Sequence, residues 1–465
     1  MSTSSANAGR LGARLFDGQP VRLPLAFAGG ALLAGVAAAF LGPIALAGPV
    51  VIAITVWLAR NPVPLLTAYL SIGVFKGTPL LDRLPIDPTL ALGALLAAVC
   101  LVRLLSGRAF TVPMPLAATF VLLGVLLVLS LMWTPVPGYG GEKALKFWTL
   151  TLLAVGAPFC VVESERDLRA LFGWLLAIAV LGAVVTLVFG EVSAAEDINN
   201  ANTGRLEFGG VENTIFTSRL LCAGAIVAFF GPAMGLGGRW GRVGLPLLGI
   251  GLVAVAASIG SRGPLVSLVL ALALTVAAIV VRNPRALVPL LAMVAVGVAA
   301  FPFVALPETS AARLRGITED PLGTLQGDGR SRLYRQAIEI TGEHPVLGFG
   351  AGGFNLYSAV LIRKDLRYPH NIFLEAAAEI GIPAALALAA CVIALLVGLF
   401  RRAWATDGTR RRMQVQLVTG LFLVAFFAAQ FSGDINDNRM LWAALGLGWL
   451  IARHGVPAST AQTRA

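Results

Sequence analysis

The sequence predicts an all-α polytopic membrane protein with about twelve to fourteen transmembrane helices and one long extracytoplasmic loop. Of its 465 residues, 57% are hydrophobic and only 13% are charged, and the mean hydropathy is +0.83. These values lie outside the range of ordinary soluble domains. The apolar residues also form continuous runs, such as residues 116–133, rather than alternating with polar ones. Continuous runs indicate spanning helices and exclude a transmembrane β-barrel.

Fourteen hydrophobic segments are candidate spans. Several are shorter than the ~20 residues needed to cross a bilayer, notably the one around Leu66, which leaves a re-entrant or interfacial segment and a total of twelve as the alternative. The segments cover residues 23–41, 44–59, 63–74, 90–105, 114–133, 144–162, 168–189, 215–235, 245–259, 265–281, 286–303, 382–400, 415–431 and 440–452.

The distribution of charge predicts the orientation. With the N-terminus inside, the cytoplasmic connections hold 19 of the 35 bases and 5 of the 24 acids, and the other face holds the remaining 16 bases and 19 acids. This asymmetry is a positive-inside pattern, so the net charge of +11 needs no nucleic-acid partner. We expect two cytoplasmic tails, residues 1–22 and 453–465, of which the first is retained because no convincing cleavage site follows it.

Between the tails, the predicted division is into N-terminal transmembrane helices (23–306), a large periplasmic loop (307–369) and C-terminal transmembrane helices (370–452). The four cysteines all fall within apolar segments without CxxC spacing, so we expect them to pack as small hydrophobic residues. No HExxH, Walker A, GxSxG or metal-ligand cluster is present, so no metal and no cofactor are expected.

The loop of residues 307–369 is too long to be a simple linker, so we expect function there. Within it, residues 328–345 have the pattern of an amphipathic helix, with Leu333, Ala337 and Ile340 at helical spacing and Arg330 on the opposite face.

The next stretch, LGFGAGGF, contains the glycine spacing GxGxxG at Gly348, Gly350 and Gly353. In a Rossmann unit this spacing would hold a dinucleotide phosphate, but no strand or βαβ pattern surrounds it. We therefore expect a tight turn that lets the backbone approach a helix or a ligand.

Four short strings occur in order around this loop: SRGP (261–264), GRSRLY (329–334), HPVLGFGAGGF (344–354) and PHNIFLEAAAEIG (369–381). Together they resemble the O-antigen ligase and Wzy-type polymerase family. The resemblance implies a GT-C-like, metal-independent, inverting glycosyltransferase of the bacterial inner membrane, with its active site facing the periplasm. Such enzymes transfer a glycan from undecaprenyl diphosphate either to lipid A-core, in lipopolysaccharide biosynthesis, or to another lipid-linked repeat, in O-antigen or exopolysaccharide polymerisation. Membrane lipids are expected to surround the protein, and no nucleic-acid partner is expected.

By this resemblance, Arg262, Arg330 and His370 match the family's catalytic arginines and histidine. Arginine suits a site where a lipid diphosphate departs, because its fork binds phosphate oxygens and stays protonated. A neutral imidazole at a helix start suits the removal of a proton from an acceptor hydroxyl. The alternatives are that Arg262 snorkels to head groups, that Arg330 lies on a solvated helix face, and that His370 caps or packs.

Further substrate-binding candidates lie on the same predicted face. Arg219 is near the start of another span, Glu375 and Glu379 either hold His370 or the acceptor or form helix-face salt bridges, and Arg439 belongs with Asp434 and Asp437 either to an ion-pair cluster or to acceptor contacts. The residues predicted to bind substrate are Arg219, Arg332, Asn371, Glu375 and Arg439.

Two other classes of protein remain as rivals. A lipid-linked oligosaccharide flippase or other transporter predicts internal repeats and ionisable residues near mid-bilayer, and neither pattern is found. A non-catalytic assembly scaffold predicts no transfer by the purified protein. Between ligase and polymerase the motifs do not decide.

Overall fold

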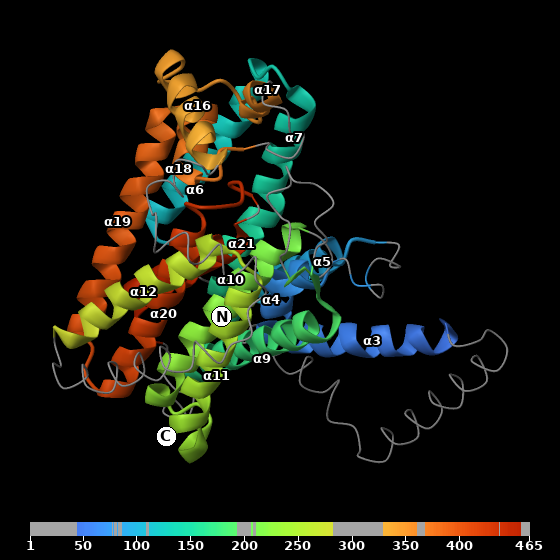
Figure 1. Cartoon of the computed structure of the whole chain (residues 1–465), viewed down its shortest axis with the longest axis vertical. Helices are drawn as coiled ribbons and strands as arrows, with labels where there is room; N and C mark the ends of the chain where they lie inside the picture. Colours follow the sequence, from blue (N-terminus) through green and yellow to red (C-terminus); the bar gives the residue numbers. More distant parts are fainter. Residues whose placement is uncertain are drawn as a thin grey trace, which may run out of the picture. The chain divides into compact units, whose positions relative to one another are not determined.

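The computed structural model describes residues 44–76, 78, 81, 86–107, 111–192, 206–207, 211–281, 329–359, 368–436 and 438–456. The chain divides into two compact units, residues 1–61 and 62–465. In the first unit the described helix is α3 (Ile44–Arg60). All the elements discussed below belong to the second unit (Figure 1).

Eight described helices are long and apolar enough to cross a membrane. They are α5 (Pro88–Leu105), α6 (Met114–Leu129) continued by η2 to Met132, the continuous helix α7–η3–α8 (Pro137–Val161), α9 (Glu165–Phe189), α10 (Val211–Phe230) continued by η4 to Met234, α11 (Gly238–Ser258), α12 (Arg262–Val280) and α19 (Ile382–Ala405). Three other predicted spans also contain helices, namely α4 (Pro62–Ser71) with η1 (Ile72–Phe75), α20 (Thr409–Ala428) and α21 (Arg439–His454).

The all-α prediction is confirmed. Within the described ranges, the strands are the two-residue pair β1 (Glu191–Val192) and β2 (Leu206–Glu207), which pair antiparallel. The predicted segments 23–41 and 286–303 lie outside the described residues, so the total of twelve to fourteen spans stays a prediction.

Local sequence determines where several helices begin. At the start of α9, the Ser164 hydroxyl accepts from the backbone N–H of Asp167 at 3.1 Å, and the Asp167 carboxylate accepts from the Ser164 N–H at 2.9 Å. This reciprocal capping box satisfies two helix-end donors and allows a turn of only three residues between α8 and α9.

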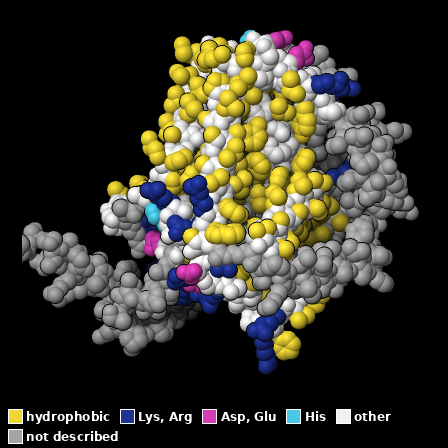
Figure 2. Space-filling model, turned by 90° about the vertical axis from the view of Figure 1, so that its left-hand side faces the viewer, with side chains coloured by type: hydrophobic (Ala, Val, Ile, Leu, Met, Phe, Trp, Pro, Cys, Tyr) yellow, Lys and Arg dark blue, Asp and Glu magenta, His cyan; other side chains and the backbone are white. Residues whose placement is uncertain are grey.

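The connections predicted to be cytoplasmic contact one another at one end of the second unit. Arg103, at the end of α5, donates to the Glu163 carboxylate at 2.9 Å, and Gln414 donates to Glu165 at 2.9 Å. Arg402 donates to the Arg453 carbonyl at 2.7 Å. Figure 2 shows basic side chains gathered below a broad hydrophobic band on the visible face. These connections thus lie together at one end, and the orientation of the chain in the membrane stays a prediction.

Cysteine labelling from each side of the membrane tests the predicted orientation. Gly342, at the end of α16 (Gly329–Glu343), is exposed and open around its Cα, and Thr409 is exposed at the basic end. Gly342→Cys should react with a membrane-impermeant maleimide from the periplasmic face, and Thr409→Cys only after the inner face is opened. The four native cysteines are buried, so background should be low. Labelling with the sides reversed would overturn the orientation.

The helix α10 is central to the second unit. It packs against α9, α11, α12 and α20, and 83% of its span is buried. A side chain at Gly224 would place a Cβ 2.4 Å from the Cβ of Ala179 on α9, so glycine is needed for this close approach. A polar residue on α10 therefore faces protein rather than lipid.

The short segment around Leu66 is buried inside the protein. Leu65, Leu66 and Tyr69 of α4 are at most 1% exposed, and α4 packs against α5, α8 and α9. Burial of this kind explains why ten residues suffice here, since neighbouring helices rather than lipid surround the segment.

Candidate functional site

The described part of the large loop packs as a small layer at one end of the second unit, at the top of Figure 1. Its core joins Leu333, Ala337 and Ile340 of α16 to Phe354 of α17 (Phe354–Ala359) and Ala378 of α18 (Ile372–Ile380). The predicted amphipathic helix is confirmed, and it buries the face that the spacing indicates.

The glycine-rich string forms the predicted tight turn. The N–H of Phe349 donates to the Ala378 carbonyl at 2.8 Å, and the N–H of Gly350 donates to the Glu379 carbonyl at 2.9 Å. Gly348 has a φ of 69°, and a Cβ there would lie 2.3 Å from the backbone of Glu379. The glycines thus serve close backbone packing against α18 and not nucleotide binding.

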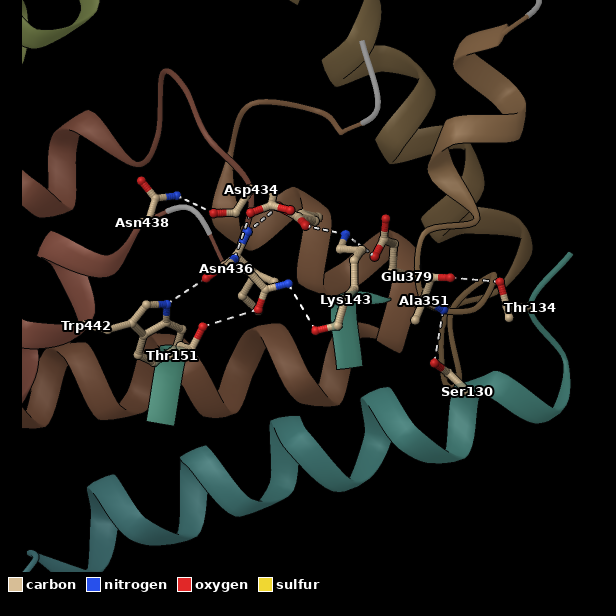
Figure 3. A network of polar contacts seen from close by, with 12 residues as sticks. Ser130, Thr134, Lys143, Thr151, Ala351, Glu379, Asp434, Asn436, Asn438 and Trp442 are labelled. Atoms are coloured by element: carbon tan, nitrogen blue, oxygen red, sulfur yellow. Dashed lines mark hydrogen bonds and ion pairs between the residues drawn. The ribbon is translucent and has the colours of Figure 1, made fainter. Parts of the chain in front are cut away.

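The turn also anchors this layer to the transmembrane helices. The Ala351 N–H donates to the Ser130 hydroxyl at 3.0 Å, and the Thr134 hydroxyl donates to the Ala351 carbonyl at 2.8 Å (Figure 3). Ser130 and Thr134 lie at and just after the C-terminal end of α6, so these two hydrogen bonds attach the loop to that end of the helix.

The predicted base, His370, stands just before α18. It is half-buried, its φ of 59° is unusual for a residue other than glycine, and its ring lies 4.7 Å from that of Tyr368. The next residue, Asn371, is the helix N-cap, and its side-chain oxygen accepts from the N–H groups of Phe373 and Leu374 at 3.0 and 3.1 Å. The sequence predicted Asn371 to bind substrate, and the structure uses it to hold the turn that carries His370.

Three of the four motif strings meet at the end of α20. The Tyr334 hydroxyl donates to the Gln430 carbonyl at 2.9 Å, and the Asn371 amide reaches the same carbonyl at 3.5 Å. A Cβ on Gly263 would lie 3.0 Å from the Cβ of Phe431. The strings around Arg262, Tyr334 and His370 are therefore neighbours in space although they are far apart in sequence.

The structure places the predicted arginines of these strings differently. Arg262 is the first residue of α12, is half-buried, and makes no hydrogen bond or ion pair with the residues that the structure describes. Arg330 lies in the first turn of α16, and its side chain falls outside the described part. Arg332 is exposed on α16. Arg262 is thus the described arginine that is available to a ligand at this junction.

Two other predicted binding residues, Arg219 and Arg439, line the same pocket together with Ser71 and Asn438. Arg219 is 7% exposed, and its guanidinium donates to Asn438 Oδ1 at 2.9 Å and to the carbonyls of Ala428 and Ser432. Arg439 lies over the Tyr69 ring, 5.5 Å from its centroid. Arg219 and Arg439, which the sequence placed on the same face, thus line one pocket, but Arg219 is engaged by the protein itself and holds the end of α20.

A buried ion cluster, which sequence reasoning missed, lies beneath the loop layer. Lys143 of α7 (Pro137–Lys146) contacts Glu375 Oε1 and Glu379 Oε2, each at 2.6 Å, and the three side chains are 1–2% exposed (Figure 3). We call these three residues the Lys143 cluster. Glu375 is thus engaged and shielded, and we infer for it a positioning role instead of the substrate contact that the sequence suggested. Lys143 directly precedes the predicted span 144–162, so the hydropathy pattern did not mark it as buried.

The sequence also grouped Asp434, Asp437 and Arg439. Asp434 is buried, and its carboxylate accepts from the Asn436 N–H at 2.8 Å while its carbonyl accepts from Asn438 Nδ2 at 2.6 Å. Asp437 lies outside the described residues. Asp434 therefore shapes the turn after α20.

The Lys143 cluster predicts a dependence of stability on pH. Burial raises the pKa of Glu375 from 4.5 to about 8, with Asp434 and Glu379 acting in the same direction and Lys143 opposing, and Tyr139 faces the cluster from α7. A raised pKa in the folded state means that stability from the protonated carboxyl is present below about 4.5 and is lost as pH rises through about 8.

The thermal unfolding midpoint of the wild type in detergent should therefore fall more steeply between pH 5 and 9 than that of Glu375→Gln, which cannot ionise at this position. Parallel profiles for the two proteins would show that Glu375 does not titrate in this window.

Among the described residues, no group of three or more His, Cys, Asp or Glu side chains is arranged to hold a metal ion. The four cysteines are free and buried in helices, as predicted. Metal independence stays a prediction.

Comparison with known proteins adds one match. Residues 246–389 match a family model, Wzy_C, described as O-antigen ligase. The match covers about a third of the chain, from α11 into α19, and includes Arg262, Arg330 and His370. No curated protein matches the chain.

Proposed function

Because residues 246–389 belong to the O-antigen ligase family, and the chain is a multi-helix membrane protein, we propose that it transfers a glycan from undecaprenyl diphosphate to an acceptor sugar hydroxyl. The family supports a ligase- or polymerase-type role in O-antigen biosynthesis. The donor, the acceptor and the periplasmic location of the site are our proposal.

The observation that carries the proposal is the meeting of the motif strings at the end of α20. The Gln430 carbonyl accepts from Tyr334 and Asn371, and Gly263 packs on Phe431. These contacts bring the backbone next to Arg262 and His370 to one junction. A cation and an imidazole at the edge of a membrane span are the groups that this transfer needs.

In the proposed reaction, the acceptor oxygen attacks the anomeric carbon while the bond from that carbon to the diphosphate oxygen breaks. His370 accepts the hydroxyl proton, and the diphosphate leaves with the bonding electrons. Arg262 stabilises the negative charge that develops on the leaving group, because a guanidinium bonds phosphate oxygens with two parallel hydrogen bonds. Attack opposite to the leaving group inverts the anomeric centre.

Reconstitution tests the proposal. Purified protein in proteoliposomes receives lipid-linked glycan as donor, with lipid A-core or a second lipid-linked repeat supplied separately as acceptor. We expect transfer to one of them, unchanged by EDTA. Transfer to lipid A-core identifies a ligase, and chain growth identifies a polymerase of O-antigen or exopolysaccharide.

Absence of transfer to either acceptor, with movement of the donor between leaflets, would instead identify a flippase. Loss of transfer in EDTA that magnesium or manganese restores would overturn the metal-independent mechanism.

A further inference from the structure

Resting on the proposed function, we propose that Lys143 is a positioning residue for the transfer site. Its ammonium group fixes α18, and with it the turn of His370, against the loop that follows α20 and holds Arg219. Lys143 lies outside the segment that matches the O-antigen ligase family, so the N-terminal half of the chain would complete the geometry of the site.

Lys143 fixes α18 through two carboxyl groups of that helix. Glu375 and Glu379 are one helical turn apart and therefore share a face of α18. Lys143 Nζ lies 2.6 Å from an oxygen of each, so one cation binds two successive turns of this short helix. The N-cap of the same helix is Asn371, directly after His370. A shift of α18 along or across α7 would move the imidazole with it.

The same lysine is also linked to the loop after α20. Glu375 uses its other oxygen, Oε2, to accept from the Ile435 N–H at 3.0 Å, and Asn436 Nδ2 donates to the Lys143 carbonyl at 3.2 Å. The Thr151 hydroxyl donates to Asn436 Oδ1 at 3.3 Å (Figure 3). This loop is therefore held by the backbone of Lys143 and by Glu375, whose other oxygen the Lys143 ammonium contacts.

The helix carrying Lys143 is itself specialised at this point. Immediately after α7, residues Phe147–Thr151 form a π-helical segment, η3, before α8 continues the span. Such segments are rare and are frequent at functional sites. Here the segment begins four residues after Lys143 and ends at Thr151, and these two residues both contact Asn436.

The contacts continue to the pocket arginine. Asn438, two residues beyond Asn436, accepts from Arg219 through Oδ1 at 2.9 Å and donates to the Asp434 carbonyl at 2.6 Å. A chain of contacts, each 3.2 Å or shorter, thus joins α18 to Arg219 by way of Lys143 and the loop. The Lys143 cluster is where the contacts to α18 and to the loop meet.

The Lys143 cluster is better suited to fix the geometry of the site than to raise the stability of the fold. A buried ion pair often contributes little net stability, because desolvation offsets the attraction, whereas it does constrain geometry through short, directional contacts. Misplacing a reacting group by about 1 Å can lower a rate by about 10²-fold. The expected effect of the cluster is therefore on turnover.

The experiment compares Lys143→Met with Lys146→Met in the reconstituted transfer assay. Lys146 lies on the same helix and pairs with Glu142 at 2.7 Å, but its side chain is 44% exposed, so it is a matched control. We expect Lys143→Met to lower kcat by on the order of 10-fold or more, with the donor KM near the wild-type value, and Lys146→Met to leave both unchanged. Equal kcat values for wild type and Lys143→Met would overturn the proposal.

A second variant distinguishes an effect on the position of α18 from an effect on folding. Lys143→Met alone leaves two buried carboxyl groups without the partner that they share, whereas the triple variant Lys143→Met/Glu375→Gln/Glu379→Gln has no ionisable side chain at these three positions. We expect its unfolding midpoint to be close to that of the wild type and its kcat to stay low. Restored kcat together with restored stability would show a merely structural role and overturn the proposal.

If the triple variant does not fold while Lys146→Met does, the cluster is required for folding, and that outcome also overturns a positioning role. Wild-type protein that transfers no glycan would reject the proposed function itself and is thus distinguishable from a failure of this inference.

Discussion

Replacing His370 with alanine should lower glycan transfer by on the order of 10²-fold or more, a typical general-base contribution, while binding of the lipid-linked donor remains. The imidazole is proposed to accept the proton of the attacking hydroxyl, and alanine offers no acceptor in its place. Donor binding depends on the cationic groups instead, so it should survive the substitution. Turnover and donor binding are to be measured separately in the same proteoliposomes.

The wild type should also lose activity as pH falls below the ordinary titration range of histidine, ~6.5, because a protonated imidazole cannot accept the proton. His344→Ala is the matched control. His344 belongs to the same loop, is exposed, and packs with its ring 5.2 Å from that of Phe349. It should retain wild-type turnover and pH profile.

Either of two results would exclude His370 as the general base. If His370→Ala abolished donor binding, the histidine would be a donor contact. If turnover and the pH profile were unchanged, the positive φ of His370 and its contact with Tyr368 would mark a turn residue only.

Replacing Arg262 with lysine should abolish most activity although the positive charge is kept. A lysine ammonium is a point charge with no planar fork, and it cannot reproduce two parallel hydrogen bonds to a diphosphate. Arg262 is free of hydrogen bonds and ion pairs to the described protein atoms, so the loss should come from the ligand and not from the fold.

Arg335→Lys serves as the control, because Arg335 is exposed on α16 in the same layer and is not among the residues predicted to bind substrate. Expression and the unfolding midpoint of both variants should match those of the wild type. Near-normal turnover of Arg262→Lys would favour snorkelling of Arg262 to lipid head groups over a diphosphate contact.

The sequence by itself determined the all-α character of the chain and its local turns. These features depend on residues close together in the chain: apolar runs make spans, Leu333, Ala337 and Ile340 recur at helical spacing, and basic residues mark one side. The glycines of LGFGAGGF likewise revealed a close backbone approach, because only glycine permits it. Asn371 was predicted to bind substrate, and its use as the N-cap of α18 was not predicted.

Only the tertiary structure decided which distant groups meet. Lys143 pairs with carboxylates 232 and 236 residues away, and Arg219 donates to acceptors more than 200 residues along the chain. No periodicity specifies such partners, because a buried charge is satisfied by whichever group helix packing brings within about 3 Å. The sequence could therefore recognise Arg219 and Glu375 as unusual. Helix packing determined the partners of both residues, and through these partners they hold the elements that surround His370 and Arg262.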